Sequence, residues 1–419
     1  MFARHCWANP PGTQAEEVDP RGRSLSHHQR GRLYLFSNQF VPTINRDPLG
    51  KPTFQAGARH NPASFSVKRG PFVHQTFKPS PIWLMSCLMI ASHSPHRFSV
   101  APMMDWTDRH DRFFLRQISR RVRLYTEMIT TQAILRGDRA RLLDFDAAEH
   151  SLALQIGGAE PDAMAACARI AEDWGYEEVN INVGCPSDRV QSGRFGACLM
   201  REPDVVAECV VAMRGAVSIP VTVKCRIGVD DQEPAEVLPS FVETVAGAGC
   251  ETFIVHARKA WLSGLSPAQN RDVPPLDYPL VHALKRARPD LTISINGGIA
   301  DLDAALPHLN VLDGVMMGRA AYQTPWVLSN VDQRVFGDDT ASPDRWEVAE
   351  AMVEYAARRG AEGVPLKSIT RHMMGLFHGL PGARSWRRAL GEEVRLPDAS
   401  PALIRRAALM VRTPDQVAS

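Results

Sequence analysis

The chain has 419 residues, 44% of them hydrophobic, and its 48 Lys and Arg residues nearly balance its 46 Asp and Glu residues. This length suits one domain of barrel size plus a smaller one, and the composition excludes fibrous and wholly disordered proteins. Because the net charge is only +2, any nucleic-acid surface must be a local basic patch.

Residues 1–95 mix Pro, Arg, His, Gln and Ser and show no sustained helical or strand period. We interpret them as a largely disordered extension, with a true start at Met85 or Met89 as the alternative. The chain contains no run of 18 apolar residues and its eight cysteines form no Cys-x-x-Cys pair. We therefore expect no membrane span and no metal site, and a cytoplasmic, reducing location.

From residue 96 onward, short runs rich in β-branched residues recur, and stretches of helical period such as 161–174 and 203–214 separate most of them. The eight runs are 98–101, 124–127, 152–155, 179–182, 221–224, 252–255, 292–295 and 314–317. This alternation predicts an α/β fold, a (β/α)8 TIM barrel over residues 96–343. A doubly wound open sheet is the alternative, but its phosphate-binding glycines usually follow the first strand, where this chain has Ala101-Pro102-Met103-Met104.

After residue 344 the strand pattern stops. Four segments rich in Arg and His read as amphipathic helices, namely 347–359, 366–380, 384–390 and 402–411. We therefore predict a small helical C-terminal domain over residues 344–419.

Polar side chains stand at the ends of six predicted strands, where a buried strand tolerates them only if they are paired. They are Gln155, Asn180, Asn182, Lys224, Arg226, His256, Arg258 and Asn296. Each one alone could simply cap a strand or bond a loop carbonyl. Six neighbouring strands with the same feature favour a shared ligand at the C-terminal rim, where barrel enzymes build their sites.

Two glycine segments follow the last two predicted strands, Asn296-Gly297-Gly298 and Gly318-Arg319. Loops at these places in a barrel often hold a phosphate through backbone N–H groups, and glycine allows close approach. The alternative is two tight turns.

Cys185 follows the fourth predicted strand and precedes Pro186, which favours an extended backbone. A thiol with a reference pKa of about 8.5 is mostly protonated at neutral pH and can donate a proton. A buried structural cysteine is the alternative, and it suits Cys198 and Cys225 better than a cysteine at the mouth of a strand.

Several motifs together resemble the tRNA-dihydrouridine synthases, most closely their A subfamily. The resemblance covers residues 98–390, and nothing of the family pattern covers residues 1–95. Its motifs are Ala101-Pro102-Met103-Met104-Asp105-Trp106-Thr107-Asp108, Leu154-Gln155-Ile156-Gly157-Gly158, Asn180-Ile181-Asn182-Val183-Gly184-Cys185-Pro186-Ser187, Gly193-Arg194-Phe195-Gly196-Ala197, Val223-Lys224-Cys225-Arg226-Ile227-Gly228, His256-Ala257-Arg258-Lys259-Ala260-Trp261 through Asn270-Arg271, and Ser294-Ile295-Asn296-Gly297-Gly298-Ile299.

The resemblance implies a flavin-binding barrel followed by a helical tRNA-binding domain, with FMN as cofactor and NADPH as its reductant. It implies that the backbone at three residues lines the isoalloxazine ring, namely Pro102, Met103 and Met104. It further implies that three side chains contact the flavin and its tail, namely Gln155, Lys224 and His256. The phosphate would be held by Asn296, Gly297, Gly298, Gly318 and Arg319.

By the same resemblance, the enzyme reduces uridine in the tRNA D-loop, at positions 20 and 20a. Hydride from flavin N5 reaches uracil C6, and Cys185 protonates C5, while Lys224 stabilises the reduced flavin. The implied tRNA contacts are Asn182, Ala268, Arg271, Arg384 and Arg387, although relatives carry a longer side chain than Ala268. We expect a monomer whose partner is tRNA, with no membrane association.

Two other functions stay open at this point. A flavin barrel acting on a free pyrimidine would keep the lysine and the glycines but would not need the Arg-rich helical tail. A non-catalytic RNA-binding protein with the same fold would bind no flavin.

Overall fold

The computed structural model describes residues 94–187 and 193–412. The extension predicted over residues 1–95 therefore lies outside the described residues, apart from its last two positions.

The described strands form one sheet in which every pairing is parallel, in the order β1-β9-β8-β7-β6-β5-β4-β2, with β3 also paired to β4. A bridge between Ser99 and Arg123 joins the two ends of this order, which closes the barrel and rules out an open sheet. The strands are β1 (Phe98–Val100), β2 (Leu124–Tyr125), β3 (Ile129–Thr130), β4 (Leu152–Gly157), β5 (Glu178–Val183), β6 (Val221–Arg226), β7 (Thr252–His256), β8 (Thr292–Asn296) and β9 (Gly314–Met317). The predicted TIM barrel is confirmed, and β3 is a short addition to the eight predicted strands.

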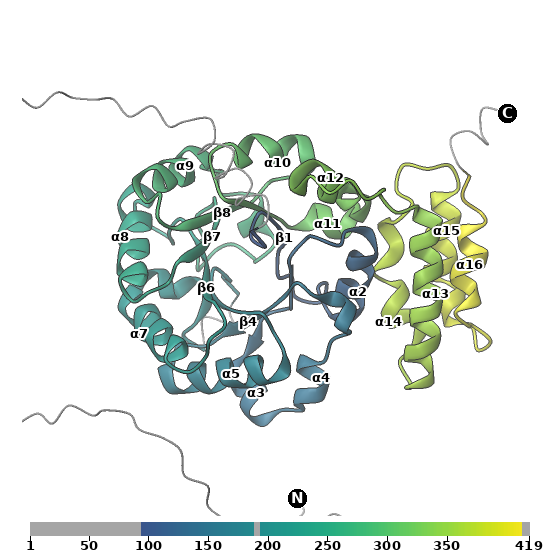
Figure 1. Ribbon diagram of the computed structural model, residues 1–419, viewed down its shortest axis with the longest axis horizontal. Helices are drawn as coiled ribbons and strands as arrows, with labels where there is room; N and C mark the ends of the chain where they lie inside the picture. Colours follow the sequence, from purple (N-terminus) through teal and green to yellow (C-terminus); the bar gives the residue numbers. More distant parts are fainter. Residues whose placement is uncertain (1–93, 188–192, 413–419) are drawn as a thin grey trace, which may run out of the picture. The chain divides into compact units, whose positions relative to one another are not determined.

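Helices surround the barrel in chain order (Figure 1). They are α2 (Arg109–Ile118), α3 (Thr131–Arg136), α4 (Arg139–Leu143), α5 (Pro161–Trp174), α7 (Pro203–Arg214), α8 (Pro234–Gly247), α9 (Tyr278–Ala287), α10 (Leu302–Leu309), α11 (Arg319–Gln323) and α12 (Val331–Phe336). Many starts follow simple local rules: α5, α7, α8 and α9 carry proline in their first turn, and Asp side chains cap α2, α9 and α10.

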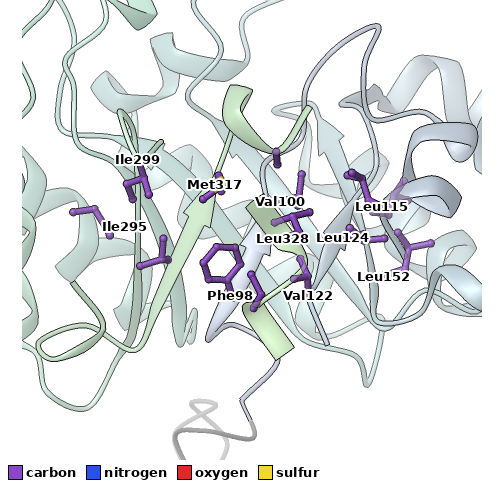
Figure 2. Packing of buried hydrophobic residues seen from close by; sticks show 14 of the residues in the cluster. Phe98, Val100, Leu115, Val122, Leu124, Leu152, Ile295, Ile299, Met317 and Leu328 are labelled. Carbon is purple, nitrogen blue, oxygen red and sulfur yellow. The ribbon is translucent and has the colours of Figure 1, made fainter. Parts of the chain in front are cut away.

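The main core lies between the strands and these helices. Figure 2 shows part of it, where Phe98, Leu124 and Leu152 of the strands pack with Leu115 and Leu328, and all five are buried. A second, smaller cluster contains residues from alternating positions of several strands, and Met103 packs on it. Its members are Ala101, Tyr125, Ala153, Ile254 and Met316. Side chains thus fill the barrel, as expected for a packed core rather than a pore.

Four further helices follow the barrel, as predicted: α13 (Arg345–Ala361), α14 (Leu366–Thr370), α15 (Ala383–Gly391) and α16 (Ala402–Ala408). The single helix expected over residues 366–380 is wrong in its length, because α14 ends at Thr370 and only a 3-10 turn follows, Met373–Gly375. A Cβ at Gly375 would lie 2.3 Å from the carbonyl oxygen of Gln323. The backbone at Gly375 therefore approaches the end of α11 too closely to accommodate a side chain.

The C-terminal helices pack against α2 of the barrel. Tyr355 of α13 stacks on Phe113, with ring centroids 4.0 Å apart, and its hydroxyl lies 2.8 Å from Nδ1 of His110. Arg371 and His372 both reach the carboxylate of Asp108, at 2.8 and 3.1 Å. No described helix is both long and apolar enough to cross a membrane.

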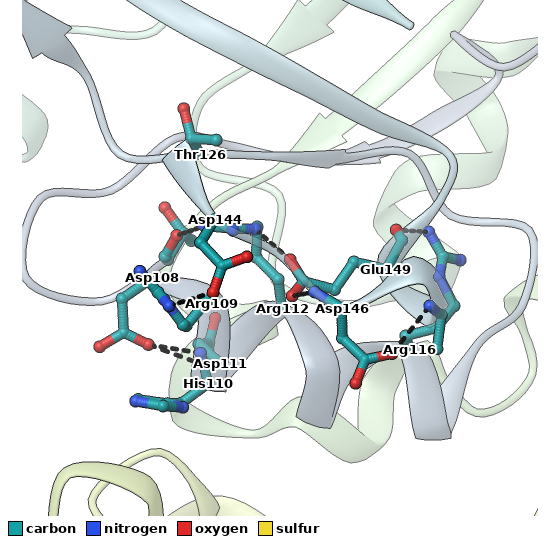
Figure 3. Close-up of polar contacts among 12 residues, drawn as sticks. Asp108, Arg109, His110, Asp111, Arg112, Arg116, Thr126, Asp144, Asp146 and Glu149 are labelled. Atoms are coloured by element: carbon teal, nitrogen blue, oxygen red, sulfur yellow. Dashed lines mark hydrogen bonds and ion pairs between the residues drawn. The ribbon is translucent and has the colours of Figure 1, made fainter. Parts of the chain in front are cut away.

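Two ion pairs attach α2 to the segments beside it, and one of them, between Arg112 and Glu149, is buried (Figure 3). Arg112 donates through Nε to Glu149 at 2.7 Å and through Nη1 to the carbonyl oxygen of Thr107 at 2.9 Å. Arg109 reaches Asp144 at 2.5 Å. Through its bond to Thr107, Arg112 also holds the end of the loop that leads from β1 into α2 and carries Met103 and Met104.

Candidate active site

The strand register brings the predicted polar residues together at one end of the barrel. Gln155 pairs with Asn180, and Asn182 pairs with Lys224. His256 lies between Arg226 on one side and Asn296 on the other. Since all these strands are parallel, their C-terminal ends share one rim, which we call the mouth.

A chain of side-chain hydrogen bonds runs from the mouth down into the barrel interior, as far as the N-terminal end of β5. Asn182 donates to Gln155 at 2.7 Å, Gln155 donates to Asn180 at 2.7 Å, and Asn180 donates to Thr222 at 2.8 Å. The Thr222 hydroxyl in turn donates to the buried carboxylate of Glu178 at 2.7 Å. These bonds fix the orientation of each amide, and among the described residues the second N–H of Asn182 has no hydrogen-bond partner.

Cys185 lies half-buried in the loop that follows β5. Its backbone N–H donates to Oδ1 of Asn182 at 3.0 Å, and its carbonyl oxygen accepts from the N–H of Ala197 at 2.9 Å. The thiol donates to the hydroxyl of Ser187 at 3.5 Å. The loop is thus held in place at Cys185 itself. The Asn182 side chain that accepts this bond is also the first member of the hydrogen-bond chain that starts at the mouth.

Basic side chains gather around this thiol. Burial, with Arg226 close by, lowers the pKa of Lys224 to about 8. Burial, with Arg226 and Lys224 close by, lowers the pKa of His256 well below its usual value. Cys185 interacts electrostatically with Lys224, Arg226 and Arg271. In the described part of the chain no carboxylate forms an ion pair with Lys224, Arg226 or His256, so the mouth is suited to an anion.

Gly297 and Gly298 form a tight cradle beside His256. Their φ angles are +116° and +71°, a region that favours glycine. A Cβ at Gly297 would lie 2.7 Å from the His256 ring, and one at Gly298 would lie 2.5 Å from Leu276. The side chain of Asn296 donates to the carbonyl oxygen of Met316 at 2.8 Å, which steadies the start of the cradle.

The second glycine segment is arranged differently. A Cβ at Gly318 would meet nothing closer than 4.0 Å, so space alone does not require glycine there. Arg319 is bound to Asp272, with its two nitrogens 2.6 and 3.1 Å from the carboxylate. A phosphate at this place would therefore share Arg319 with Asp272.

The loop after β1 forms another side of the mouth. The Met103 N–H donates to the hydroxyl of Thr107 at 2.9 Å, and Met104 is 55% exposed. Pro102 and Met103 are half-buried. Asp105 adopts a left-handed backbone with φ of +63°, and its N–H donates to Glu127 at 2.5 Å. No role was predicted for Glu127 from the sequence. Its position at the C-terminal end of the predicted strand 124–127 was nevertheless a sign that it lies at the mouth.

The predicted tRNA contacts lie on two elements. Ala268 and Arg271 are exposed in the segment after β7, which includes the 3-10 helix η3 (Gln269–Arg271). Arg384 and Arg387 are exposed on α15, and no described carboxylate pairs with either of them. Of these residues, Arg271 lies close enough to Cys185 to interact with it electrostatically. Among the described residues, no contact joins Ala268, Arg384 or Arg387 to Cys185.

Comparison with known proteins gives the family. Residues 99–409 match the family model described as dihydrouridine synthase (Dus). The chain belongs to the dihydrouridine synthase family. Among similar curated proteins, the tRNA-dihydrouridine(20/20a) synthase of Salmonella typhimurium is 56% identical over 317 residues, which cover 75% of this chain and 95% of that protein. Proteins of the same name from Escherichia coli K12 and Synechocystis are 56% and 54% identical, and the matches cover 76% of this chain and 92% and 96% of those proteins.

One buried residue of this dihydrouridine synthase family member has a place that sequence reasoning did not foresee. Arg226 donates to the carbonyl oxygens of Gly184, Lys259 and Asn270, at 3.1, 3.0 and 2.9 Å. The sequence placed it at the rim but assigned it no role. Arg226 lies two residues after Lys224 on β6, so both side chains point to the same face of the strand. This spacing could have indicated that Arg226 also faces the barrel interior.

Proposed function

We propose that this protein reduces uridine to 5,6-dihydrouridine in the tRNA D-loop, at positions 20 and 20a, with FMN as cofactor and NADPH as reductant. The names of the relatives support the tRNA positions. The observation that carries the chemistry is a half-buried thiol, Cys185, beside Lys224 and Arg226, neither of which pairs with a carboxylate among the described residues.

The residues of the mouth fit FMN. Its phosphate is anionic, and the backbone of Gly297 and Gly298, in a conformation that favours glycine, would present N–H groups to it beside His256. The isoalloxazine ring would lie against Pro102, Met103 and Met104, within reach of Gln155 and Lys224. Asn296 with Gly297 and Gly298 would hold the phosphate, aided by Gly318 and Arg319.

When bound and reduced by NADPH, FMN supplies the hydride that adds to C6 of uracil. Cys185 donates the thiol proton to C5, so that one hydride and one proton saturate the double bond, and the thiolate regains a proton from solvent. The protonated Lys224 balances negative charge on the cofactor. The remaining amide N–H of Asn182 is available to a carbonyl oxygen of the uracil, which orients the base.

The substrate uridine must leave its stack to enter the mouth. Arg271 beside the mouth, and Arg384 and Arg387 on α15, would bind RNA phosphates. We propose that the enzyme works as a monomer in the cytoplasm, where tRNA is found. The six described cysteines are all free thiols, which fits a reducing compartment.

The decisive experiment compares wild-type protein with Cys185→Ala, using tRNA from a strain that lacks dihydrouridine. Mass spectrometry should show dihydrouridine formation slowed by roughly 10²- to 10⁴-fold in the variant, because a general acid is lost. NADPH oxidation by oxygen should persist, since the thiol takes no part in it. Cys198→Ala is the matched control, because Cys198 is also half-buried but donates to the Phe195 carbonyl oxygen. Equal rates in Cys185→Ala and wild type would reject the proposed acid.

A further inference from the structure

The segment that follows β7 is irregular but firmly held, and Asn270 is its internal anchor. This side chain is 0% exposed. It accepts from the N–H of Trp261 at 2.7 Å, and it donates to the carbonyl oxygens of Trp261 at 2.9 Å and Leu265 at 3.2 Å. A segment with little regular secondary structure, the 3-10 helix η3, is thereby given a fixed conformation.

The same segment is attached to the β6 end of the mouth. Arg226 donates to the carbonyl oxygens of Lys259 and Asn270. A bridge joins Ala260 to Val229, and the N–H of Leu262 donates to Asp230 at 2.7 Å. Because Arg226 also holds the Gly184 carbonyl, the segment is fixed relative to the loop that carries Cys185.

Within this fixed segment the Trp261 side chain remains 42% exposed. Among the described residues it is the one tryptophan that is exposed rather than half-buried or buried. The Lys259 ammonium lies 5.5 Å from the centre of its ring, within cation–π range. A large aromatic ring presented on a rigid loop beside a cation is the arrangement that proteins use to stack an unpaired base.

We propose that Trp261, with Lys259 against its ring, stacks an unpaired base of the tRNA next to the target uridine. This inference rests on the proposed function and names a contact for it. When the uridine leaves its stack, a neighbouring base loses a stacking partner, and Trp261 replaces that partner. The Lys259 ammonium lies where it can also bind a phosphate of the same nucleotide. Arg271, at the other end of the segment, faces the RNA from a second position.

The first test measures tRNA affinity of the FMN-loaded enzyme as a function of salt concentration. Trp261→Ala should weaken binding by roughly 5- to 150-fold, the range for loss of one stacked base, and Trp261→Phe should restore most of it. The slope of log affinity against log salt should stay unchanged in Trp261→Ala, because tryptophan releases no counterions. Lys259→Ala should instead reduce that slope. Unchanged affinity in Trp261→Ala would overturn the proposal.

Trp174→Ala is the matched control. Trp174 is half-buried at the end of α5, and the strand that follows begins only four residues later, so this side chain lies at the end of the barrel opposite the mouth. Its replacement should leave tRNA affinity unchanged. An equal loss of affinity in Trp174→Ala would show that the effect of Trp261→Ala is not a local contact, and would overturn the proposal.

A spectroscopic test reports on the stack itself. Two D-arm stem-loop RNAs carry 2-aminopurine directly 5′ or directly 3′ of the target uridine. Wild type and Trp261→Phe should quench one of them on binding, and Trp261→Ala should not. If the wild type quenches but forms no dihydrouridine, the proposed function fails and the stacking contact stands. If the wild type forms dihydrouridine and Trp261→Ala quenches equally, the stacking contact fails and the function stands.

Discussion

Arg226 donates a hydrogen bond through Nε to the carbonyl oxygen of Gly184, at 3.1 Å, in the residue directly before Cys185. The side chain is 3% exposed, and its Nη1 also holds the carbonyl oxygens of Lys259 and Asn270. One planar guanidinium therefore sets the distance between the loop of the proposed acid and the segment that carries Trp261 and Arg271.

Arg226→Lys should act through this positioning. Lysine keeps the charge but cannot span three carbonyl oxygens in one plane, so the Cys185 loop should shift. A misplacement of about 1 Å lowers kcat for dihydrouridine formation by on the order of 10²-fold. The visible flavin spectrum and NADPH oxidation by oxygen should change far less. Steady-state kinetics on tRNA check this, and a wild-type kcat in Arg226→Lys would rule out the positioning role.

Lys224 should make the stability of the cofactor-free protein depend on pH. Burial and Arg226 lower its pKa to about 8, against 10.5 in the unfolded chain. Between these values the folded state binds fewer protons than the unfolded state, so stability should rise as pH increases from 8 to 10.5. Lys224→Met should remove this rise and gain up to about 3 kcal/mol at neutral pH. Urea denaturation between pH 8 and 10.5 measures the free energy of unfolding of wild type and of Lys224→Met. A wild-type stability that falls over this range, while that of Lys224→Met does not, would contradict the prediction.

Asp108 should stabilise the junction between α2 and the C-terminal helices. Burial alone would raise its pKa, but hydrogen bonds from His372 and Arg371 hold the pKa of Asp108 well below its usual value. This stability is present above the unfolded pKa of about 3.9 and is lost as pH falls below it. Asp108→Asn keeps an N-capping side chain but removes the charge that Arg371 and His372 contact, and should cost roughly 1–3 kcal/mol at neutral pH. Thermal unfolding measures the cost, and an unchanged Tm would refute this role.

Asp111 should behave in the opposite way, although it lies in the same helix. Burial, with Asp108 close by, raises the pKa of Asp111 well above its usual value, and within residues 94–187 and 193–412 neither of its carboxylate oxygens has a hydrogen-bond partner. The folded state retains this proton, so stability should fall as pH rises above about 4. Asp111→Asn keeps the shape without the charge and should gain on the order of 1 kcal/mol at neutral pH but little near pH 4. A loss of stability at neutral pH would contradict this.

Arg384 and Arg387 should contribute to RNA binding through phosphate contacts. Replacing both with alanine should weaken tRNA binding and lower the slope of log affinity against log salt by roughly 1 to 2. Arg169→Ala is the control, because Arg169 is exposed on α5 and no described carboxylate pairs with it. A slope as steep as that of wild type would exclude these two residues as phosphate ligands.

The polar residues of the mouth could be predicted because parallel strands bring their C-terminal ends to one rim. Gln155, Asn182, Lys224, His256 and Asn296 needed only the order of strands to be placed together. The roles of the individual residues stay a prediction, as does the domain boundary at residue 344.

Contacts between distant segments could not be predicted. Asn270 lies in the three-residue 3-10 helix η3, which is too short to show a periodic pattern, so its burial left no trace in the sequence. The bond from Arg319 to Asp272 spans 47 residues, and the bond from His372 to Asp108 spans 264. The strand β3 has two residues, too few to show an alternation. The close approach of Gly375 to the Gln323 carbonyl oxygen is likewise a contact between distant segments, which local propensity does not indicate.

Because Tyr355 of α13 stacks on Phe113, helix α2 packs against the C-terminal helices as well as against the barrel strands. A barrel cut away from its C-terminal helices would expose Phe113 and leave His110 without its hydroxyl partner. Deletion of residues 345–419 would then report on misfolding instead of RNA recognition. The helices cannot be exchanged as a cassette between family members unless the matching surface of α2 is transferred with them.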